Sequence, residues 1–291
     1  KKDTPQKVNI KLFRQGAKDI RLNDTKISQK ELIGTLNTVI FCPEDLQLIK
    51  GTPSGRRRFL DMEISQTSAI YYHQLMQYNR LLQQRNAVLK EYRGKNTIPL
   101  EEWDLQLADM ASFIVKKRLE SLKKINLLID LMNRKLTGGL ENLTIGYEQP
   151  YMDNGSLEYT KEGFYERIKA ALPQDRHRMT TSVGPHRDDL RFFSDAMDLK
   201  KFGSQGQQRT AVLSLKLSEL EFIKSEVGEY PVLLLDDVLS ELDESRRTNL
   251  LQFIHKRIQT FITTTDIHDF KDLKSVQFIS CEGGQVQYGQ P

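Results

Sequence analysis

The chain has 291 residues, a formal net charge of +4, 38% hydrophobic residues and 28% charged residues. These values exclude a disordered chain and a broadly acidic surface, and the length allows one large domain or two smaller ones. No apolar run is long enough to span a bilayer, and no secretory signal is recognisable, so we expect no membrane partner. The distant cysteines Cys42 and Cys281 predict no disulfide framework and indicate a reducing, cytoplasmic compartment.

Strand patterns come first in the chain. Residues 8–12 alternate apolar and polar side chains, and residues 18–22 lead into the turn signal Asn23-Asp24. Residues 38–41 form a short β-branched run that ends before Pro43. We therefore expect three strands in this region.

Two long helical patterns follow. Residues 56–92 contain neither proline nor glycine and repeat apolar side chains at helical spacings, and residues 100–136 do the same before Gly138-Gly139. We expect an antiparallel helical hairpin packed on the body of the protein. A long coiled-coil arm is the weaker alternative, because no strict heptad persists.

Strands and helices alternate in the rest of the chain. We expect strands at 143–147 and 188–193, with a helix at 161–172 between them. From Ser204 the pattern predicts a helix to about residue 225, then a strand at 232–235, a helix at about 244–258 and a strand at 260–264. The last three elements form a βαβ unit, which has parallel strands.

Two adjacent carboxylates, Asp236 and Asp237, follow the apolar strand at 232–235, which we expect to be buried on both faces. Ligands of open α/β sheets bind at the carboxyl ends of the strands. Facing a phosphate, one carboxylate would hold Mg²⁺ and the other would orient or deprotonate the attacking water. The alternative is a helix N-terminus that carries acidic residues to match the helix dipole.

The segment at 203–210 reads Gly-Ser-Gln-Gly-Gln-Gln-Arg-Thr and leads into the helix that follows. Ser204 is a candidate N-cap, and Gln207 would complete a capping box. The same helix end offers backbone N–H groups to an anion, and Gly206 leaves room for a phosphate to approach closely. The capping and anion-binding interpretations are compatible.

Four motifs, in this order, resemble the RecF family of recombination-repair ATPases. They are Pro43-Glu44-Asp45-Leu46 with Gly51 and residues 56–61, then residues 184–190, 203–210 and 234–243. ABC transporter subunits and SMC heads share the last two of these motifs but not the first two. The resemblance implies an α/β fold of the ABC-type ATPase head, with a largely helical lobe II at 55–225 inserted between the lobe I segments at 1–54 and 226–291.

The resemblance also implies roles for single residues. Asp236 would be the Walker B carboxylate associated with Mg²⁺, and Asp237 would be catalytic where most ABC ATPases carry Glu. Because aspartate is one methylene shorter, we expect weak ATP hydrolysis. A switch residue is expected at the end of the strand at 260–264. Thr264 and Thr265 are both candidates, and Thr265 is the one chosen.

A further implication of the resemblance is an ATP-dependent homodimer. In such a dimer the helix end of one protomer contacts the γ-phosphate bound by the other. The residues implied in this contact are Ser204, Gln205, Gly206 and Gln207, with Asp243 at the dimer seam.

Basic residues cluster on both helical patterns. Arg56, Arg57 and Arg58 begin the first, and Lys116 and Lys117 lie on the second. A solvated helix face is the usual meaning of such runs, but a family that acts on DNA favours phosphate contacts. We expect salt-sensitive, sequence-tolerant DNA binding.

The sequence contains no Gly-x-x-x-x-Gly-Lys-Ser/Thr phosphate loop. In the RecF family this loop lies N-terminal to the segment resembling residue 1 onward, so we expect a truncated chain that binds ATP poorly by itself. The implied function is ATP-driven dimerisation at DNA gaps or single/double-strand junctions, helping RecR and RecO to load RecA. Two alternatives stay open: a fragment that binds DNA or a partner without ATPase activity, and an SMC-like structural ATPase head.

Overall fold

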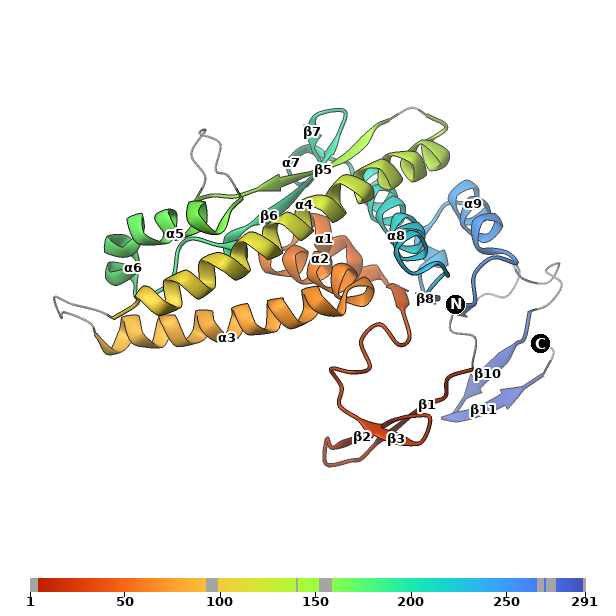
Figure 1. The fold of residues 1–291 in the computed structure, drawn as a ribbon. Coiled ribbons are helices and arrows are strands. Elements are labelled where there is room, and N and C mark those ends of the chain that lie inside the picture. The colour runs from red at the N-terminus through yellow and green to blue at the C-terminus, as the bar shows by residue number, and fades with distance from the viewer. Residues whose placement is uncertain are drawn as a thin grey trace.

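A computed structural model of the chain describes residues 5–92, 99–139, 141–151, 159–265, 270 and 276–289. Long helices extend to one side of a small parallel sheet, and two small antiparallel sheets lie near the ends of the chain (Figure 1). These two sheets are built from β1 (Val8–Leu12), β2 (Lys18–Leu22) and β3 (Thr25–Ile27), and from β10 (Ile279–Glu282) and β11 (Gln285–Tyr288).

The parallel sheet has the order β4-β8-β9, with β4 at Thr38–Phe41, β8 at Val232–Asp236 and β9 at Thr260–Thr263. Helix α9 (Glu244–Ile254) connects β8 to β9, so the predicted βαβ unit with parallel strands is confirmed.

The prediction that β8 is buried on both faces is wrong for the described part of the chain. Leu233 and Leu235 are buried, whereas Leu234 is half-buried and lies in register between Ile40 and Phe261. Ile40 is 51% exposed and Phe261 is 52% exposed, because no described element packs over this row of side chains.

The first long helical pattern is two helices, not one. Helix α2 spans Pro53–Thr67 and α3 spans Ala69–Glu91. Between them Ser68 has an extended backbone, and its hydroxyl accepts a 3.2 Å hydrogen bond from the Tyr71 N–H, as an N-cap does. Helix α4 (Glu101–Thr137) matches the second pattern and ends at Gly138, whose φ of 68° suits glycine.

A third antiparallel sheet packs beside the long helices. It contains β5 (Leu143–Glu148), β6 (Asp189–Ser194) and β7 (Met197–Asp198). The helix expected at 161–172 is divided into α5 (Lys161–Ala170) and α6 (Leu172–Arg178), because a proline occupies the first turn of α6. Short helical segments connect the larger elements: η1 (Pro43–Leu46), α1 (Gln47–Lys50), η2 (Pro185–Arg187), α7 (Leu199–Phe202) and η3 (Leu239–Glu241).

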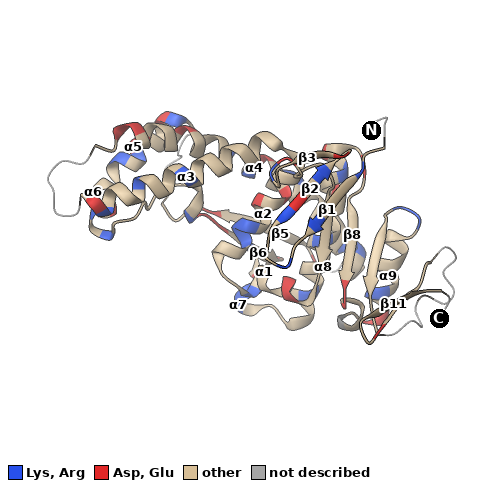
Figure 2. Cartoon of the chain, turned by 90° about the horizontal axis from the view of Figure 1, so that it is seen from below, with Lys and Arg blue, Asp and Glu red and all other residues tan. Residues whose placement is uncertain are grey.

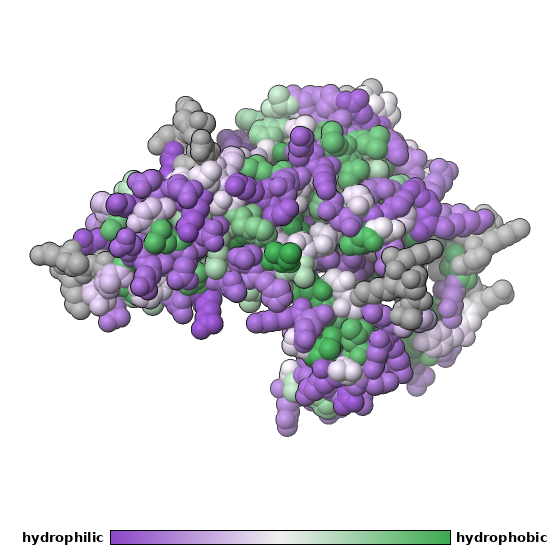
Figure 3. All heavy atoms as spheres, viewed as in Figure 1, coloured by the Kyte–Doolittle hydropathy of each residue, from purple (hydrophilic) through white to green (hydrophobic). Residues whose placement is uncertain are grey.

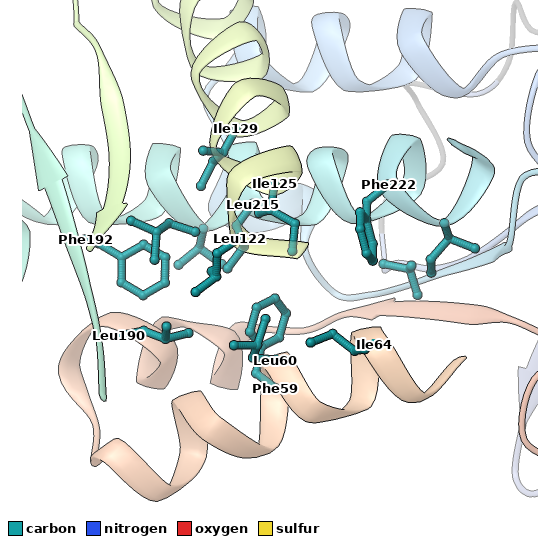
Figure 4. Close-up of a cluster of buried hydrophobic side chains, with 14 of the residues drawn as sticks. Phe59, Leu60, Ile64, Leu122, Ile125, Ile129, Leu190, Phe192, Leu215 and Phe222 are labelled. Atoms are coloured by element: carbon teal, nitrogen blue, oxygen red, sulfur yellow. The ribbon is translucent and has the colours of Figure 1, made fainter. Parts of the chain in front are cut away.

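Helix α8 (Gln205–Val227) lies at the centre of the hydrophobic core. Its side chains are buried all around the helix, including Leu215 and Phe222. Figure 4 shows these residues facing side chains from α2, α4 and β6, among them Leu60, Ile125 and Phe192. One core therefore joins α8 to the long helices and to the β5-β6-β7 sheet.

The surface in Figure 3 is mostly hydrophilic, with hydrophobic side chains gathered over the C-terminal half of α4. Leu127 and Leu131 of α4 are 72% and 46% exposed. Within the described ranges, the helices all fall short of the length and apolar character needed to cross a membrane.

Candidate functional site

Asp236 ends β8 opposite Thr263, the last residue of β9. The Thr263 hydroxyl donates a 2.6 Å hydrogen bond to Asp236 Oδ1 and accepts a 3.1 Å hydrogen bond from the Asp237 N–H. All three residues are exposed at the carboxyl edge of the sheet. The hydroxyl thus fixes one oxygen of a carboxylate that faces solvent, at the edge where α/β sheets bind ligands.

Asp237 has a left-handed backbone, with φ of 51°. Aspartate tolerates this conformation better than most residues because its short polar side chain bonds locally. The Ser240 hydroxyl lies 2.8 Å from the Asp237 carbonyl oxygen and 3.2 Å from its Oδ1, so it orients this carboxylate. The sharp turn directs the chain away from the sheet immediately after Asp236.

The donor set fits Mg²⁺ bound together with phosphates. The described residues contain no group of three or more side chains suited to hold a metal by themselves. Mg²⁺ is usually bound by one or two carboxylates, with waters and substrate phosphates completing the shell. Asp236 and Asp237 supply that number of carboxylates.

Asp243 has a local structural role. Its carboxylate accepts a 2.9 Å hydrogen bond from the Arg246 N–H and caps α9. The same carboxylate lies 2.5 Å from the Arg246 guanidinium. It remains about half exposed, at 52%, so a contact at a dimer seam is sterically open.

The N-terminus of α8 forms the expected capping box. The Ser204 hydroxyl accepts a 3.2 Å hydrogen bond from the Gln207 N–H, and Gln207 Oε1 accepts a 3.0 Å hydrogen bond from the Ser204 N–H. Ser204, Gln205 and Gly206 are exposed, and a side chain at Gly206 would meet open space. In the described structure the Gln205 and Gly206 N–H groups have no acceptor, so they are available to an anion.

The two halves of the predicted site do not touch within the described residues. No hydrogen bond or ion pair there joins residues 204–207 to Asp236 or Asp237. Between them lies a small cavity, lined by Arg209 and Val212 of α8 together with Val238 and Leu242. Each half therefore presents its polar groups outward.

Thr263 was not among the residues predicted from the sequence. Thr265, the predicted switch residue, is exposed two positions beyond the end of β9, and Thr264 precedes it. Strand pairing was the signal that could have found Thr263. When the parallel strands 232–236 and 260–263 are aligned at their carboxyl ends, Thr263 lies opposite Asp236.

The basic residues predicted to bind DNA lie in different environments. Arg56 is buried at 3% exposure, and its guanidinium makes two hydrogen bonds to the Asp189 carboxylate, at 2.7 and 2.8 Å. This residue is part of the fold, because its charge is compensated inside the protein. Arg58 and Lys116 are exposed, and Lys117 pairs with Glu120 at 2.7 Å.

A buried charge cluster joins α8 to the segment after β4. Lys216 of α8 lies 3.3 Å from Asp45 and 3.3 Å from Glu219. Burial raises the pKa of nearby Glu63 to about 7, with Lys216 opposing and Asp45 reinforcing the shift. One cation is thus shared by three carboxylates at the junction of α2, η1 and α8.

Two bacterial proteins are similar to nearly the whole chain. It is 47% identical over 270 residues to the DNA replication and repair protein RecF of Alkaliphilus oremlandii, which covers 92% of this chain and 73% of that protein. It is 46% identical over 287 residues to the protein of the same name from Clostridium botulinum, covering 97% and 78%. The chain belongs to the RecF family. No protein-family model matches it.

Solved RecF structures share the fold. The recombination mediator protein RecF with ATP, of the RecFOR pathway, superposes with a TM-score of 0.87 at 35% identity, covering 98% of this chain and 76% of that one. The RecF–ATPrS structure gives a TM-score of 0.86 at 36% identity, covering 97% and 76%. The α/β fold of the ABC-type ATPase head that the motifs predicted is thereby confirmed.

Proposed function

We propose that this RecF family member is an ATP-dependent DNA repair protein with a composite nucleotide site. Asp236 binds Mg²⁺ together with the ATP phosphates, and Asp237 orients the attacking water. The N-terminus of α8 in one protomer contacts the γ-phosphate held by its partner, through Ser204 and the Gln205 and Gly206 N–H groups. The observation that carries the proposal is the exposed Asp236 carboxylate held by Thr263 at 2.6 Å.

A composite site explains why ATP controls dimerisation. Contacts from residues 204–207 to the partner's nucleotide exist only in the closed dimer, so ATP favours that state by differential binding. This arrangement is supported by the exposure of both half-sites, residues 204–206 at the start of α8 and Asp236 and Asp237 after β8. We further propose that 1–54 and 226–291 form one lobe and 55–225 the other.

The dimer acts on DNA in this proposal. It engages gaps or single/double-strand junctions through exposed basic residues such as Arg58 and Lys116, and works with RecR and RecO in loading RecA. Figure 2 marks Lys and Arg positions in blue on the ribbons of α3 and α5. The solved RecF structures that resemble the chain are those of a recombination mediator in the RecFOR pathway, which supports these partners.

Hydrolysis should be slow, because the Asp237 side chain is one methylene shorter than glutamate. Asp237→Asn removes the base without changing size, and asparagine tolerates the left-handed backbone at this position. In the protein as the cell makes it, we expect this variant to accumulate ATP-bound dimers while turnover falls at least about tenfold. Light scattering after gel filtration measures the dimer, and phosphate release measures turnover.

A matched control separates this effect from loss of surface charge. Glu229 is exposed in the loop before β8, and Glu229→Gln removes the same charge. It should leave both measurements unchanged. Unchanged turnover in Asp237→Asn would show that Asp237 has no catalytic role.

The second candidate function is binding of DNA or a partner without ATPase activity. The absence of a phosphate loop from the 291 residues favours it. Titration of this chain with ATP distinguishes the two candidates. Weak binding, together with normal ATP-dependent dimers in the protein as the cell makes it, supports the composite site. DNA binding that persists with no ATP response in either form supports the second candidate. An SMC-like head would need longer heptad arms than α3 and α4 provide.

DNA binding through Arg58 and Lys116 has its own test. Because the contacts are to phosphates, Arg58→Gln/Lys116→Gln should reduce the slope of log affinity against log salt by about 1–2. Affinities for duplexes of unrelated sequence should fall together. A slope near zero in the unaltered protein would contradict phosphate binding.

A further inference from the structure

An open cleft with a volume of about 1030 Å³ lies among the helices, and its lining includes none of residues 204–207, 236 and 237. Its walls come from the start of α2, the segment after β5, helices α5 and α6, and η2. In Figure 1, α5 and α6 lie at the opposite end of the molecule from β8 and α9. The cleft is therefore a separate surface from the one assigned to ATP.

Four arginines from four different elements line this arginine cleft: Arg57, Arg167, Arg178 and Arg187. Arg57 donates a 2.7 Å hydrogen bond to the Asp188 carbonyl oxygen, and Arg187 donates a 2.6 Å hydrogen bond to the Thr181 carbonyl oxygen. Arg167 likewise donates to the Tyr151 carbonyl oxygen at 2.5 Å. Backbone carbonyls thus orient three of the guanidinium groups.

These contacts leave positive charge in the cleft. Across the described ranges, Arg57, Arg178 and Arg187 form no ion pair with a carboxylate. The fully buried arginines differ, because Arg85 pairs with Asp104 and Asp175 at 2.6 Å each. The fold neutralises Arg85 in its core, whereas Arg57, Arg178 and Arg187 keep a charge that another anion could pair with.

Arg57 shows the electrostatic cost of this arrangement. Burial, followed by the neighbouring Arg118 guanidinium, lowers the pKa of Arg57 from its usual value. A bound anion opposes both effects, because an opposite charge beside a partly buried guanidinium stabilises its charged form. Geometry and charge point to the same kind of ligand.

The cleft suits carboxylates better than a nucleic acid. Arginine presents a planar fork that pairs with carboxylate in a bidentate manner, and no lysine lines this cleft among the described residues. Pro53, Pro150 and Val183 add apolar wall, which suits the side chains and backbone of a peptide. Single-stranded nucleic acid needs free stacking platforms. The Tyr151 ring is already engaged with Phe164, at 6.4 Å between ring centroids.

We propose that the arginine cleft is a docking site for a carboxylate-rich segment of a protein partner. The segment enters in an extended form, its Asp or Glu side chains pairing with Arg178 and Arg187 at the mouth and with Arg57 deeper in the cleft. Glu166 at the rim excludes segments that place an acid beside it. This function goes beyond the ATP and DNA sites and does not depend on them.

The test measures binding of two labelled probes by fluorescence anisotropy. One is a fluorescein-labelled peptide of Glu-Gly repeats, and the other is a labelled single-stranded oligo-dT of the same net charge. Arg178→Gln/Arg187→Gln removes two exposed arginines. We expect the peptide Kd to rise at least about tenfold, or about 1.4 kcal/mol, while the oligo-dT Kd changes less than about twofold.

Two further variants make the result specific. Lys161→Gln/Lys169→Gln removes the same charge from exposed positions of α5 that do not line the cleft, and should leave peptide binding unchanged. Arg178→Gln alone should raise the peptide Kd at least about threefold, and serves if the double variant fails to fold. Absence of peptide binding, an equal loss in the lysine variant, or a larger loss for oligo-dT than for the peptide would each overturn the proposal.

Discussion

Thr263 connects the ends of two neighbouring strands, donating its hydroxyl hydrogen to Asp236 at 2.6 Å while accepting from the Asp237 N–H at 3.1 Å. The hydroxyl therefore holds the proposed metal carboxylate and the backbone of the proposed catalytic residue. Residues that orient a metal ligand typically contribute 10–100-fold to affinity or activity. The hydroxyl of Thr263 deserves the same test as the two aspartates.

We predict that Thr263→Val lowers the apparent Mg²⁺ affinity in ATP hydrolysis by about tenfold. Valine has nearly the same shape as threonine and suits a strand, but it leaves Asp236 free to rotate. The measurement is the Mg²⁺ dependence of turnover in the protein as the cell makes it. Thr263→Ser keeps the hydroxyl and should retain near-normal Mg²⁺ dependence; equal losses in both variants would point to packing instead.

The sequence predicts the α/β elements well because their signals are local. The apolar run at 232–235 followed by two aspartates gives β8 and the turn after it, and Ser204 with Gln207 gives the N-terminus of α8. Both features depend on residues within a few positions of each other. The same holds for Gly138 at the end of α4.

Features that depend on distant partners were missed. Arg56 resembles a surface arginine until Asp189, 133 positions away, is placed against it. The break at Ser68 has no proline or glycine to mark it, and consists of one extended residue whose hydroxyl caps α3. Thr263 acquires its role from strand register, which a single strand does not reveal.

Arg118 of α4 lies at the centre of a buried polar network. Its guanidinium donates hydrogen bonds to both Asp61 oxygens at 2.9 Å and to the Pro185 carbonyl oxygen at 2.7 Å. We predict that Arg118→Met lowers the free energy of unfolding by about 3–5 kcal/mol, because buried carboxylates lose their partner. Urea denaturation measures the change. Lys117→Met, which removes the exposed neighbour and its bond to Glu120, should cost no more than about 1 kcal/mol.

The cluster around Lys216 predicts a pH dependence of stability. Burial raises the pKa of Glu63 from 4.5 to about 7, so between these values the folded state binds more protons than the unfolded state. Stability from this group is complete below about pH 4.5 and decreases as the pH rises towards 7. We expect Glu63→Gln to stabilise the protein at pH 8 by on the order of 1–2 kcal/mol.

Thermal unfolding of both proteins at several pH values measures this effect. The difference between Glu63→Gln and the unaltered protein should grow from pH 5 to pH 8, because only glutamate ionises. Glu229→Gln, at an exposed position, should show no such trend. A difference that stays constant with pH would mean that Glu63 remains ionised throughout, with Lys216 as its partner.

Alanine substitution should have opposite effects on the free energy of unfolding at Gly184, which precedes η2, and at Gly55 in α2. Gly184 has φ of 130°, and an added Cβ would collide with the Tyr78 hydroxyl and come within 3.2 Å of His186 Nδ1. Those two groups are hydrogen-bonded at 2.6 Å and are buried or nearly so, which leaves them little room to move. Gly184→Ala should therefore destabilise the protein by on the order of 3 kcal/mol.

Gly55 is the matched control, since it lies in α2 and an added Cβ would meet nothing within 4 Å. Gly55→Ala should raise the free energy of unfolding by about 0.5–1 kcal/mol, because alanine restricts the unfolded chain and favours helix. Urea denaturation of both variants measures the contrast. Equal effects at the two positions would show that the Gly184 backbone and the Tyr78–His186 pair both adjust to the added Cβ.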